Sequence, residues 1–276
     1  MNETPLLPDV SERAAYFPNP LFSDITLSCE GQYFPAHRPI IYPQSRHLAR
    51  AIDQSTLYPE INRTRRIYLP HTPPYLLIRV LEFLYKGDYT VSSATILSAI
   101  DSDLLRDNTA VTRAPNTNIA NPVDRDRLAI RYAACFHAKV YAQAEYFQIE
   151  GLQVLAAGRF STALWWLRQD EGGFAAAMAE IYDHRAWNYV RLHQRAVPEI
   201  LHSQTIYRTG PGFRGRVLTP QLLEQVPCLG RDLAFVAMDE VDRLRRRLAS
   251  AEQALNAVVN RAEAHARGQE SDSLDM

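Results

Sequence analysis

The chain has 276 residues, of which 46% are hydrophobic and 22% are charged. This balance is typical of a folded globular protein and excludes a chain that is disordered throughout. The formal net charge of −1 at pH 7 provides no basic field that would favour nucleic acid as a partner. The length allows one sizeable domain or two smaller ones.

The cysteines and the N-terminal residues indicate the cellular compartment that we expect for this protein. Cys29, Cys135 and Cys228 lie far apart and form no Cys-x-x-Cys pair, which argues against a disulfide framework and favours a reducing compartment. The first 20 residues lack a basic start and contain four prolines, so we do not expect a signal peptide. No stretch reaches the roughly 20 apolar residues of a membrane helix. We expect a cytoplasmic or nuclear protein without a membrane partner.

A Pro-rich lead, residues 1–20, precedes the first regular pattern. From residue 24, apolar and polar residues alternate, and Glu30-Gly31 supplies a turn, so residues 24–35 predict a β-hairpin. Short helical pieces limited by prolines follow at 37–52. Residues 67–69 predict a third strand.

The clearest helix of the first half runs to about Tyr85, with Thr72 as its expected N-cap and Gly87 as its end. Its apolar residues recur on one face, at Leu76, Leu77, Val80, Leu81 and Leu84. Residues 91–125 are rich in Ser, Asn, Thr, Asp and Pro, which predicts a polar insertion with one short helix.

From Leu128 onward helical periodicity continues almost to the end, with a break near Glu150-Gly151. Further helices are predicted at 174–185 and 187–203. A loop rich in Gly and Arg at 208–216 separates them from a final helix.

Three ordered blocks of this sequence resemble BTB/POZ domains. The first, Ser23 to Arg38, has the Ser-Asp-apolar strand, the turn and the Phe-x-Ala-His-basic ending of that family. The second, Val80 to Tyr89, resembles the family's helix end with Phe, Tyr and Gly. The third, Ala138 to Phe147, resembles its Val-Tyr-x-x-Ala-x-x-Tyr helix. The Lys-Val-Tyr-Ala form of the third block and the long insertion resemble the divergent BTB proteins of filamentous fungi.

The resemblance implies an α+β fold, with a small sheet flanked by a helical cluster and followed by an all-helical C-terminal region. It implies binding to other proteins, frequent homodimerisation, and a cullin scaffold of a ubiquitin ligase as one partner class. The insertion falls beside the surface that relatives use for cullins. The expected organisation is a lead at 1–20, a BTB/POZ domain at 21–167, a helical extension at 168–205, a loop at 206–220, a C-terminal helix at 221–266 and a tail at 267–276.

The resemblance also assigns residues. In dimeric relatives the positions of Asp24 and Arg38 face a charged pocket near the dimer interface. The alternative for them is a local ion pair or a helix-capping contact between the hairpin and the first helix. His37 is expected to be a hydrogen-bonded structural histidine. The motif residues are expected to lie in one buried cluster: Phe34, Leu81, Leu84, Tyr141 and Ala144.

Three patterns could indicate a nucleotide, metal or catalytic site, but each has a simpler structural interpretation. Residues 210–215 match Gly-x-Gly-x-x-Gly, but no strand leads into them and Pro220 limits a following helix, so we interpret them as a loop. No histidine pairs with another histidine or a cysteine at zinc-ligand spacing. Cys135 and His137, two residues apart, would point to different faces of a helix. We predict a non-enzymatic protein without metal or cofactor.

The final helix carries a heptad pattern, in which apolar residues step alternately by three and four. They are Val241, Leu244, Leu248, Ala251, Leu255, Val258 and Ala262. The pattern indicates either a coiled coil that adds to self-association or an amphipathic helix that folds back on its own domain. The predicted function is a dimerising adaptor, with a structural or transcription-related scaffold as the alternative.

Overall fold

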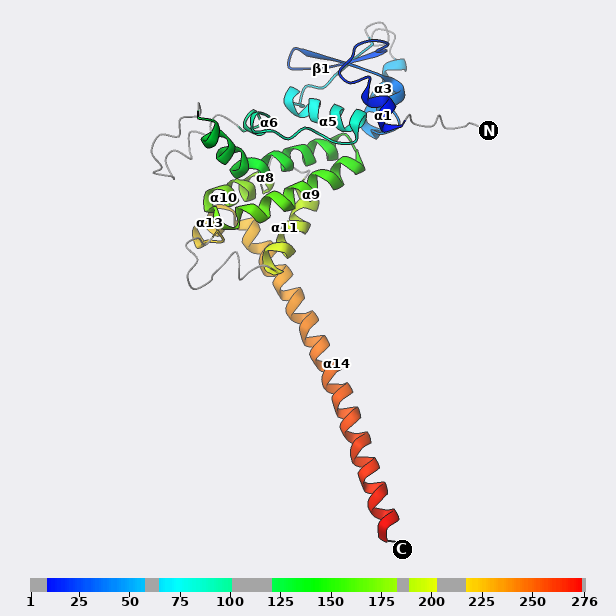
Figure 1. Cartoon of the computed structure of the whole chain (residues 1–276), viewed down its shortest axis with the longest axis vertical. Coiled ribbons are helices and arrows are strands. Elements are labelled where there is room, and N and C mark those ends of the chain that lie inside the picture. Colours follow the sequence, from blue (N-terminus) through cyan, green and yellow to red (C-terminus); the bar gives the residue numbers. More distant parts are fainter. Residues whose placement is uncertain (1–8, 58–64, 101–120, 183–188, 203–216, 275–276) are drawn as a thin grey trace, which may run out of the picture. The chain divides into compact units, whose positions relative to one another are not determined.

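The computed structural model describes residues 9–57, 65–100, 121–182, 189–202 and 217–274 (Figure 1). The chain divides into two compact units, residues 1–226 and residues 227–276. Each unit is described by itself below.

The first unit begins with a small mixed sheet. β1 (Ile25–Cys29) lies in the centre, antiparallel to β2 (Gln32–Ala36) and parallel to β3 (Arg66–Tyr68). Glu30 and Gly31 both adopt left-handed backbone conformations, with φ of 45° and 77°. Two consecutive left-handed residues are typical of a two-residue hairpin turn. The turn and the strand pairing confirm the predicted hairpin and the predicted third strand.

The two faces of the sheet differ in burial. Leu27 pairs with Phe34 and Ile67 on the inner face, whereas Ser28 pairs with Tyr33 and Tyr68 on the outer face. Leu27 and Ile67 are buried, and both tyrosines are exposed. Phe34 is only half-buried, which corrects its predicted place in the core. The reason is that β2 is an edge strand whose burial becomes complete only at Ala36.

Five described helices accompany the sheet: α1 (Val10–Ala14), α2 (Arg38–Ile41), α3 (Arg46–Leu57), α5 (Pro74–Lys86) and α6 (Ser93–Leu97). α5 ends as predicted, because Gly87 adopts φ 73° and donates its N–H to the Phe83 carbonyl. Its predicted start is wrong. Pro73 occupies the N-cap, so Thr72 lies one residue too early to cap the helix. The five apolar residues predicted for one face of α5 are all buried.

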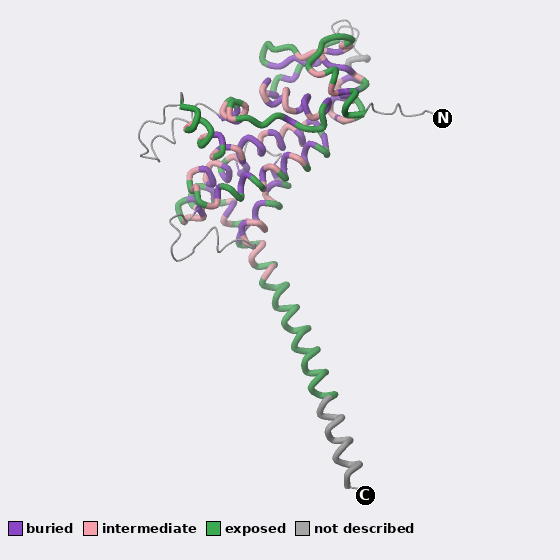
Figure 2. Tube along the Cα trace, viewed as in Figure 1, coloured by how far each residue is buried: buried purple, intermediate pink, exposed green. Residues whose placement is uncertain are grey.

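The rest of this unit is helical: α8 (Pro122–Tyr146), α9 (Glu150–Trp166), a short 3-10 turn (Leu167–Gln169), α10 (Glu171–Ile181), α11 (Val190–His202) and α13 (Pro220–Gln225). α8 is the central helix, since it contacts α5, α6, α9 and α10. Figure 2 shows buried residues along both α8 and α9. The expected α+β region followed by a largely helical region is therefore confirmed. The predicted cluster members Leu81, Leu84, Tyr141 and Ala144 are buried.

Two boundaries differ from those predicted. The N-terminal lead contains α1, and its Arg13 is buried and donates a 2.6 Å hydrogen bond to Gln44. The insertion at 91–125 is helical at both ends, in α6 and at the start of α8. Residues 101–120, and the predicted loop at 208–216, lie outside the described residues.

The second unit is α14 (Pro227–Leu274), a single helix of 48 residues. The predicted helix at 221–266 is corrected at both ends. Thr219 caps the separate helix α13, and Pro227 begins the next helix at its first position, where a missing N–H costs nothing. The helix then continues into the predicted tail. None of the described helices has the length and apolar composition needed to cross a membrane.

The burial of α5 makes a first prediction. Leu81 is 2% exposed, so Leu81→Ala should lower the free energy of unfolding by about 2–5 kcal/mol, the usual cost of truncating a buried leucine. Val154→Ala is the control, because Val154 is 68% exposed and should change stability by no more than about 0.5 kcal/mol. Urea unfolding measures both. Equal losses would place Leu81 outside the core.

Candidate functional site

His37 lies at the junction between β2 and α2 and is held on both ring nitrogens. Its Nε2 lies 2.8 Å from the Leu21 carbonyl oxygen, and its Nδ1 lies 2.8 Å from the Tyr85 hydroxyl. A carbonyl can only accept, so Nε2 carries the proton and Nδ1 accepts from Tyr85. The His37 backbone N–H donates to the same hydroxyl at 2.9 Å. His37 is therefore a hydrogen-bonded structural residue, as predicted.

Asp24 and Arg38 meet through the backbone. The Arg38 N–H donates a 2.8 Å hydrogen bond to Asp24 Oδ1 at the first position of α2. This is the helix-capping contact that the sequence left open as the alternative to a charged pocket. Within the described parts of the chain, no group accepts a hydrogen bond from the buried Arg38 Nε.

The turn that precedes β1 is apolar and exposed. Leu21 and Phe22 precede β1, and Phe22 is 78% exposed. Phe22 also has a φ of 61°, a left-handed conformation that bulky residues rarely adopt. The bond from His37 to the Leu21 carbonyl holds the turn in place. We call the residues Leu21, Phe22, Asp24, His37 and Arg38 the N-terminal corner.

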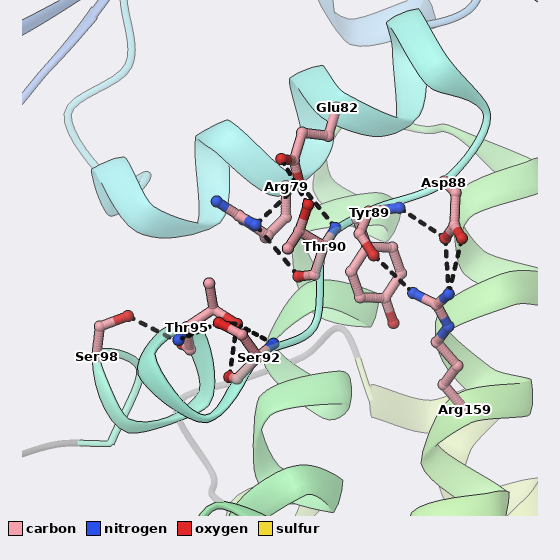
Figure 3. Close-up of polar contacts among 9 residues, drawn as sticks. All are labelled: Arg79, Glu82, Asp88, Tyr89, Thr90, Ser92, Thr95, Ser98 and Arg159. Atoms are coloured by element: carbon pink, nitrogen blue, oxygen red, sulfur yellow. Dashed lines mark hydrogen bonds and ion pairs between the residues drawn. The ribbon is translucent and has the colours of Figure 1, made fainter.

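A second polar cluster joins the end of α5 to α9 (Figure 3). Arg159 of α9 donates to the Tyr89 carbonyl at 2.9 Å and pairs with the Asp88 carboxylate at 2.8 Å. Its guanidinium lies 4.3 Å from the centre of the Tyr89 ring. Arg159 therefore fixes two consecutive residues of the segment that follows α5.

Glu82 fixes the next residue of that segment. One carboxylate oxygen accepts the Thr90 N–H at 2.8 Å, and the other accepts the Thr90 hydroxyl at 2.9 Å (Figure 3). The buried carboxylate also forms a 2.9 Å ion pair with Arg79. Ser92 then caps α6 through a reciprocal capping box with Thr95. Between α5 and α6, Asp88, Tyr89, Thr90 and Ser92 thus each take part in hydrogen bonds that hold the connecting segment.

Tyr89 also reaches α8, where its hydroxyl lies 2.8 Å from His137 Nδ1. Burial lowers the pKa of His137 to about 4, and the positive charge of Arg159 adds to the effect. Neutral His137 and Arg159 contribute to an open groove between α8 and α9 with a volume of about 360 Å³. The other lining residues are mainly apolar: Val91, Ile130, Ala133, Thr162, Ala163 and Trp166.

The structure separates the predicted site residues into groups. Asp24, His37 and Arg38 lie together in the corner, whereas Tyr141 and Ala144 belong to the core around α8. No local pattern in the sequence indicates Arg159, which contacts residues about 70 positions earlier. Tyr89 lies within the second resemblance block, but no local pattern indicates its contacts with α8 and α9.

Two of the described cysteines, Cys29 and Cys135, are buried thiols. Burial raises the pKa of the Cys135 thiol to about 12, and it also raises the pKa of Cys29. Neither is a reactive thiolate at neutral pH. Among the residues that the structure describes, no group of three or more His, Cys, Asp and Glu side chains is placed to hold a metal ion. The absence of a metal from the whole protein stays a prediction.

Residues 15–106 match the BTB/POZ domain family. The match covers the sheet, the corner and helices α2 to α6, and it ends before α8. No curated protein matches the chain. The chain thus carries a BTB/POZ domain, which is a non-catalytic interaction domain. The wider limits of 21–167 and the resemblance to fungal members stay predictions.

The pKa of His137 makes a second prediction. An unfolded histidine binds a proton below its ordinary pKa of 6.5, whereas folded His137 binds one only below about 4. Stability is therefore complete above about pH 6.5 and falls by about 3 kcal/mol as the pH drops to 4. His137→Gln does not titrate and should lose that much less between pH 7 and pH 4 in urea unfolding. The same pH dependence in both proteins would contradict the assignment.

Proposed function

We propose that this chain is a non-enzymatic adaptor that binds other proteins through its BTB/POZ domain, and that this domain self-associates. The observation that carries the proposal is the match of residues 15–106 to a family of interaction domains. The fold supports it, because the matched region has a hydrogen-bonded framework that presents exposed apolar groups. Such a role places the protein in the cytoplasm or the nucleus.

The N-terminal corner supports the proposal physically. A strained left-handed residue costs about 1–3 kcal/mol and persists where its surroundings enforce it, commonly at functional sites. Phe22 is such a residue, and it exposes an aromatic ring rather than burying it. Aromatic side chains of this kind supply much of the binding energy of protein interfaces. The corner is the part of the BTB/POZ domain that we propose contacts a partner.

Charge at the corner supports self-association. Asp24 uses one carboxylate oxygen to cap α2, and the half-buried Arg38 lies directly beside it. In a two-fold dimer each of these charges occurs twice around the axis, so that Arg38 of one copy can meet Asp24 of the other.

The partner class that we propose is a cullin-type ubiquitin ligase scaffold, with clients bound elsewhere on the adaptor. The alternative is a structural or transcription-related scaffold without a ligase. Helix α14, whose residues 241–261 are exposed, provides a second surface that either role could use.

Affinity purification with mass spectrometry tests the function. The full chain is compared with a chain carrying Phe22→Ser, and Val154→Ser on α9 is the control because Val154 is similarly exposed. The adaptor role predicts partners that are lost with Phe22→Ser and kept with the control. Cullin peptides among them support the ligase role, and chromatin or signalling proteins support the scaffold. No partner above background would contradict both.

Light scattering tests self-association of the same domain. A chain ended after Val226 retains the whole first unit and should be dimeric at tens of micromolar. Asp24→Asn with Arg38→Gln should weaken the dimer on the order of tenfold, since charge pairs at an interface are lost while the capping hydrogen bond can remain. Arg46→Gln with Glu150→Gln removes the same charge types from an exposed pair as the control. A monomeric truncated chain would show the dimer proposal to be wrong.

A further inference from the structure

Helix α14 exposes an apolar stripe over most of its described length. Every side chain from Val241 to Arg261 is exposed, including Leu248 at 61% and Leu255 at 63% (Figure 2). Surface helices normally bury such a stripe against another element. Within the second unit, residues 227–276, nothing among the described residues covers this stripe, which leaves it available for a partner helix.

The stripe has heptad order, with flanking positions that carry both charges. The core positions alternate as Val241, Leu244, Leu248, Ala251, Leu255 and Val258. One flank carries Met238, Arg245, Glu252 and Val259, and the other carries Glu240, Arg247, Ala254 and Arg261. In coiled coils these flanking positions determine the partner and its orientation. Both signs of charge on each side make the stripe complementary to itself.

We infer that α14 pairs with α14 of a second copy as an antiparallel coiled coil whose two-fold axis passes between Ala249 and Ser250. In this register Val241 faces the partner's Val258, and Leu244 faces the partner's Leu255. Leu248 faces the partner's Ala251, so each small residue lies opposite a large one. All six core positions between 241 and 258 are then filled evenly, as packing of a helix interface requires.

The flanks agree with the same register. Arg245 comes beside the partner's Glu252, and Glu240 comes beside the partner's Arg261, each pair occurring twice by symmetry. Met238 comes beside the partner's Val259. This contact accounts for two exposed apolar side chains that lie outside the seam.

A parallel, in-register pair fits less well. It places Ala251 opposite the partner's Ala251, so the side chains fill less of the interface there than in the neighbouring leucine layers. It also keeps Met238 and Val259 on different heptads, with about 30 Å of helix between them at 1.5 Å per residue. Its charges are attractive, but through different partners: Arg245 with the partner's Glu240, and Arg247 with the partner's Glu252. Charge exchange therefore distinguishes the two orientations.

Disulfide cross-linking of the full chain tests the pairing locally. Leu244→Cys and Leu255→Cys are placed in separate chains, each with Cys228→Ser, because the two remaining native thiols are buried. When the two chains are mixed in a glutathione buffer, a disulfide between them should form, and neither chain alone should form one. Gln253→Cys mixed with Asn256→Cys is the control for random collision, since both residues lie outside the seam.

Charge exchange gives the second measurement, with the yield of the mixed disulfide as readout. Arg245→Glu or Glu252→Arg alone should lower the association constant of the two helices on the order of tenfold, because each creates two like-charge pairs. The two substitutions together should restore it to within about twofold. In a parallel pair the combined change would instead produce repulsion at both partners.

This inference does not rest on the BTB/POZ proposal, because the chain ended after Val226 tests that domain without α14. A mixed disulfide with charge rescue supports the antiparallel pair even if the truncated chain is monomeric. If the Leu244→Cys chain or the Leu255→Cys chain formed a disulfide-linked dimer by itself, the antiparallel orientation would be wrong. A mixed yield no higher than that of the Gln253 and Asn256 control would overturn the pairing itself.

Discussion

The first unit depends on one short segment, Tyr85 to Thr90, which is bonded to both halves of the fold. On one side the Tyr85 hydroxyl accepts the His37 N–H and donates to its ring. On the other side Tyr89 bonds to His137 of α8 and to Arg159 of α9. Gly87 turns the chain between them, in a left-handed conformation that suits glycine. A buried hydroxyl or carbonyl without a hydrogen-bond partner costs free energy, so the loss of any one of these bonds would destabilise the segment.

This constraint links the matched domain to the helices outside the match. The family match ends at residue 106, yet the residues that hold Tyr89 lie on α8 and α9. A partner that binds the N-terminal corner therefore meets a surface whose framework extends through Tyr85 into those helices. The proposed adaptor uses its BTB/POZ domain, residues 15–106, for one set of contacts. Its second unit, α14, provides an independent surface whose pattern fits another copy of itself.

Local patterns in the sequence predicted much of the fold and less of the site. Alternation predicted the hairpin, and 3/4 spacing predicted the buried face of α5, because both depend on neighbours in the chain. The start of α5 was missed because Pro73, and not Thr72, occupies its N-cap. The separate helix α13 was missed because Pro227 begins a new helix within a segment that was predicted to be one continuous helix. Arg159 was missed because its partners are distant in sequence. The resemblance pointed to Asp24, His37 and Arg38 of the corner, whereas Leu21 and Phe22 were found only in the structure.

Residues 9–57, 65–100 and the helices α8 and α9 are expected to unfold as one unit, because the segment from Tyr85 to Thr90 joins them. Two native thiols report on it directly, since Cys29 is buried in β1 and Cys135 is buried in α8. Pulsed thiol labelling across a urea series, with Cys228→Ser, measures when each becomes accessible. If these elements unfold together, both thiols become accessible at one common urea midpoint. Labelling of Cys135 at clearly lower urea than Cys29 would contradict it, because the helices would then unfold separately from the sheet.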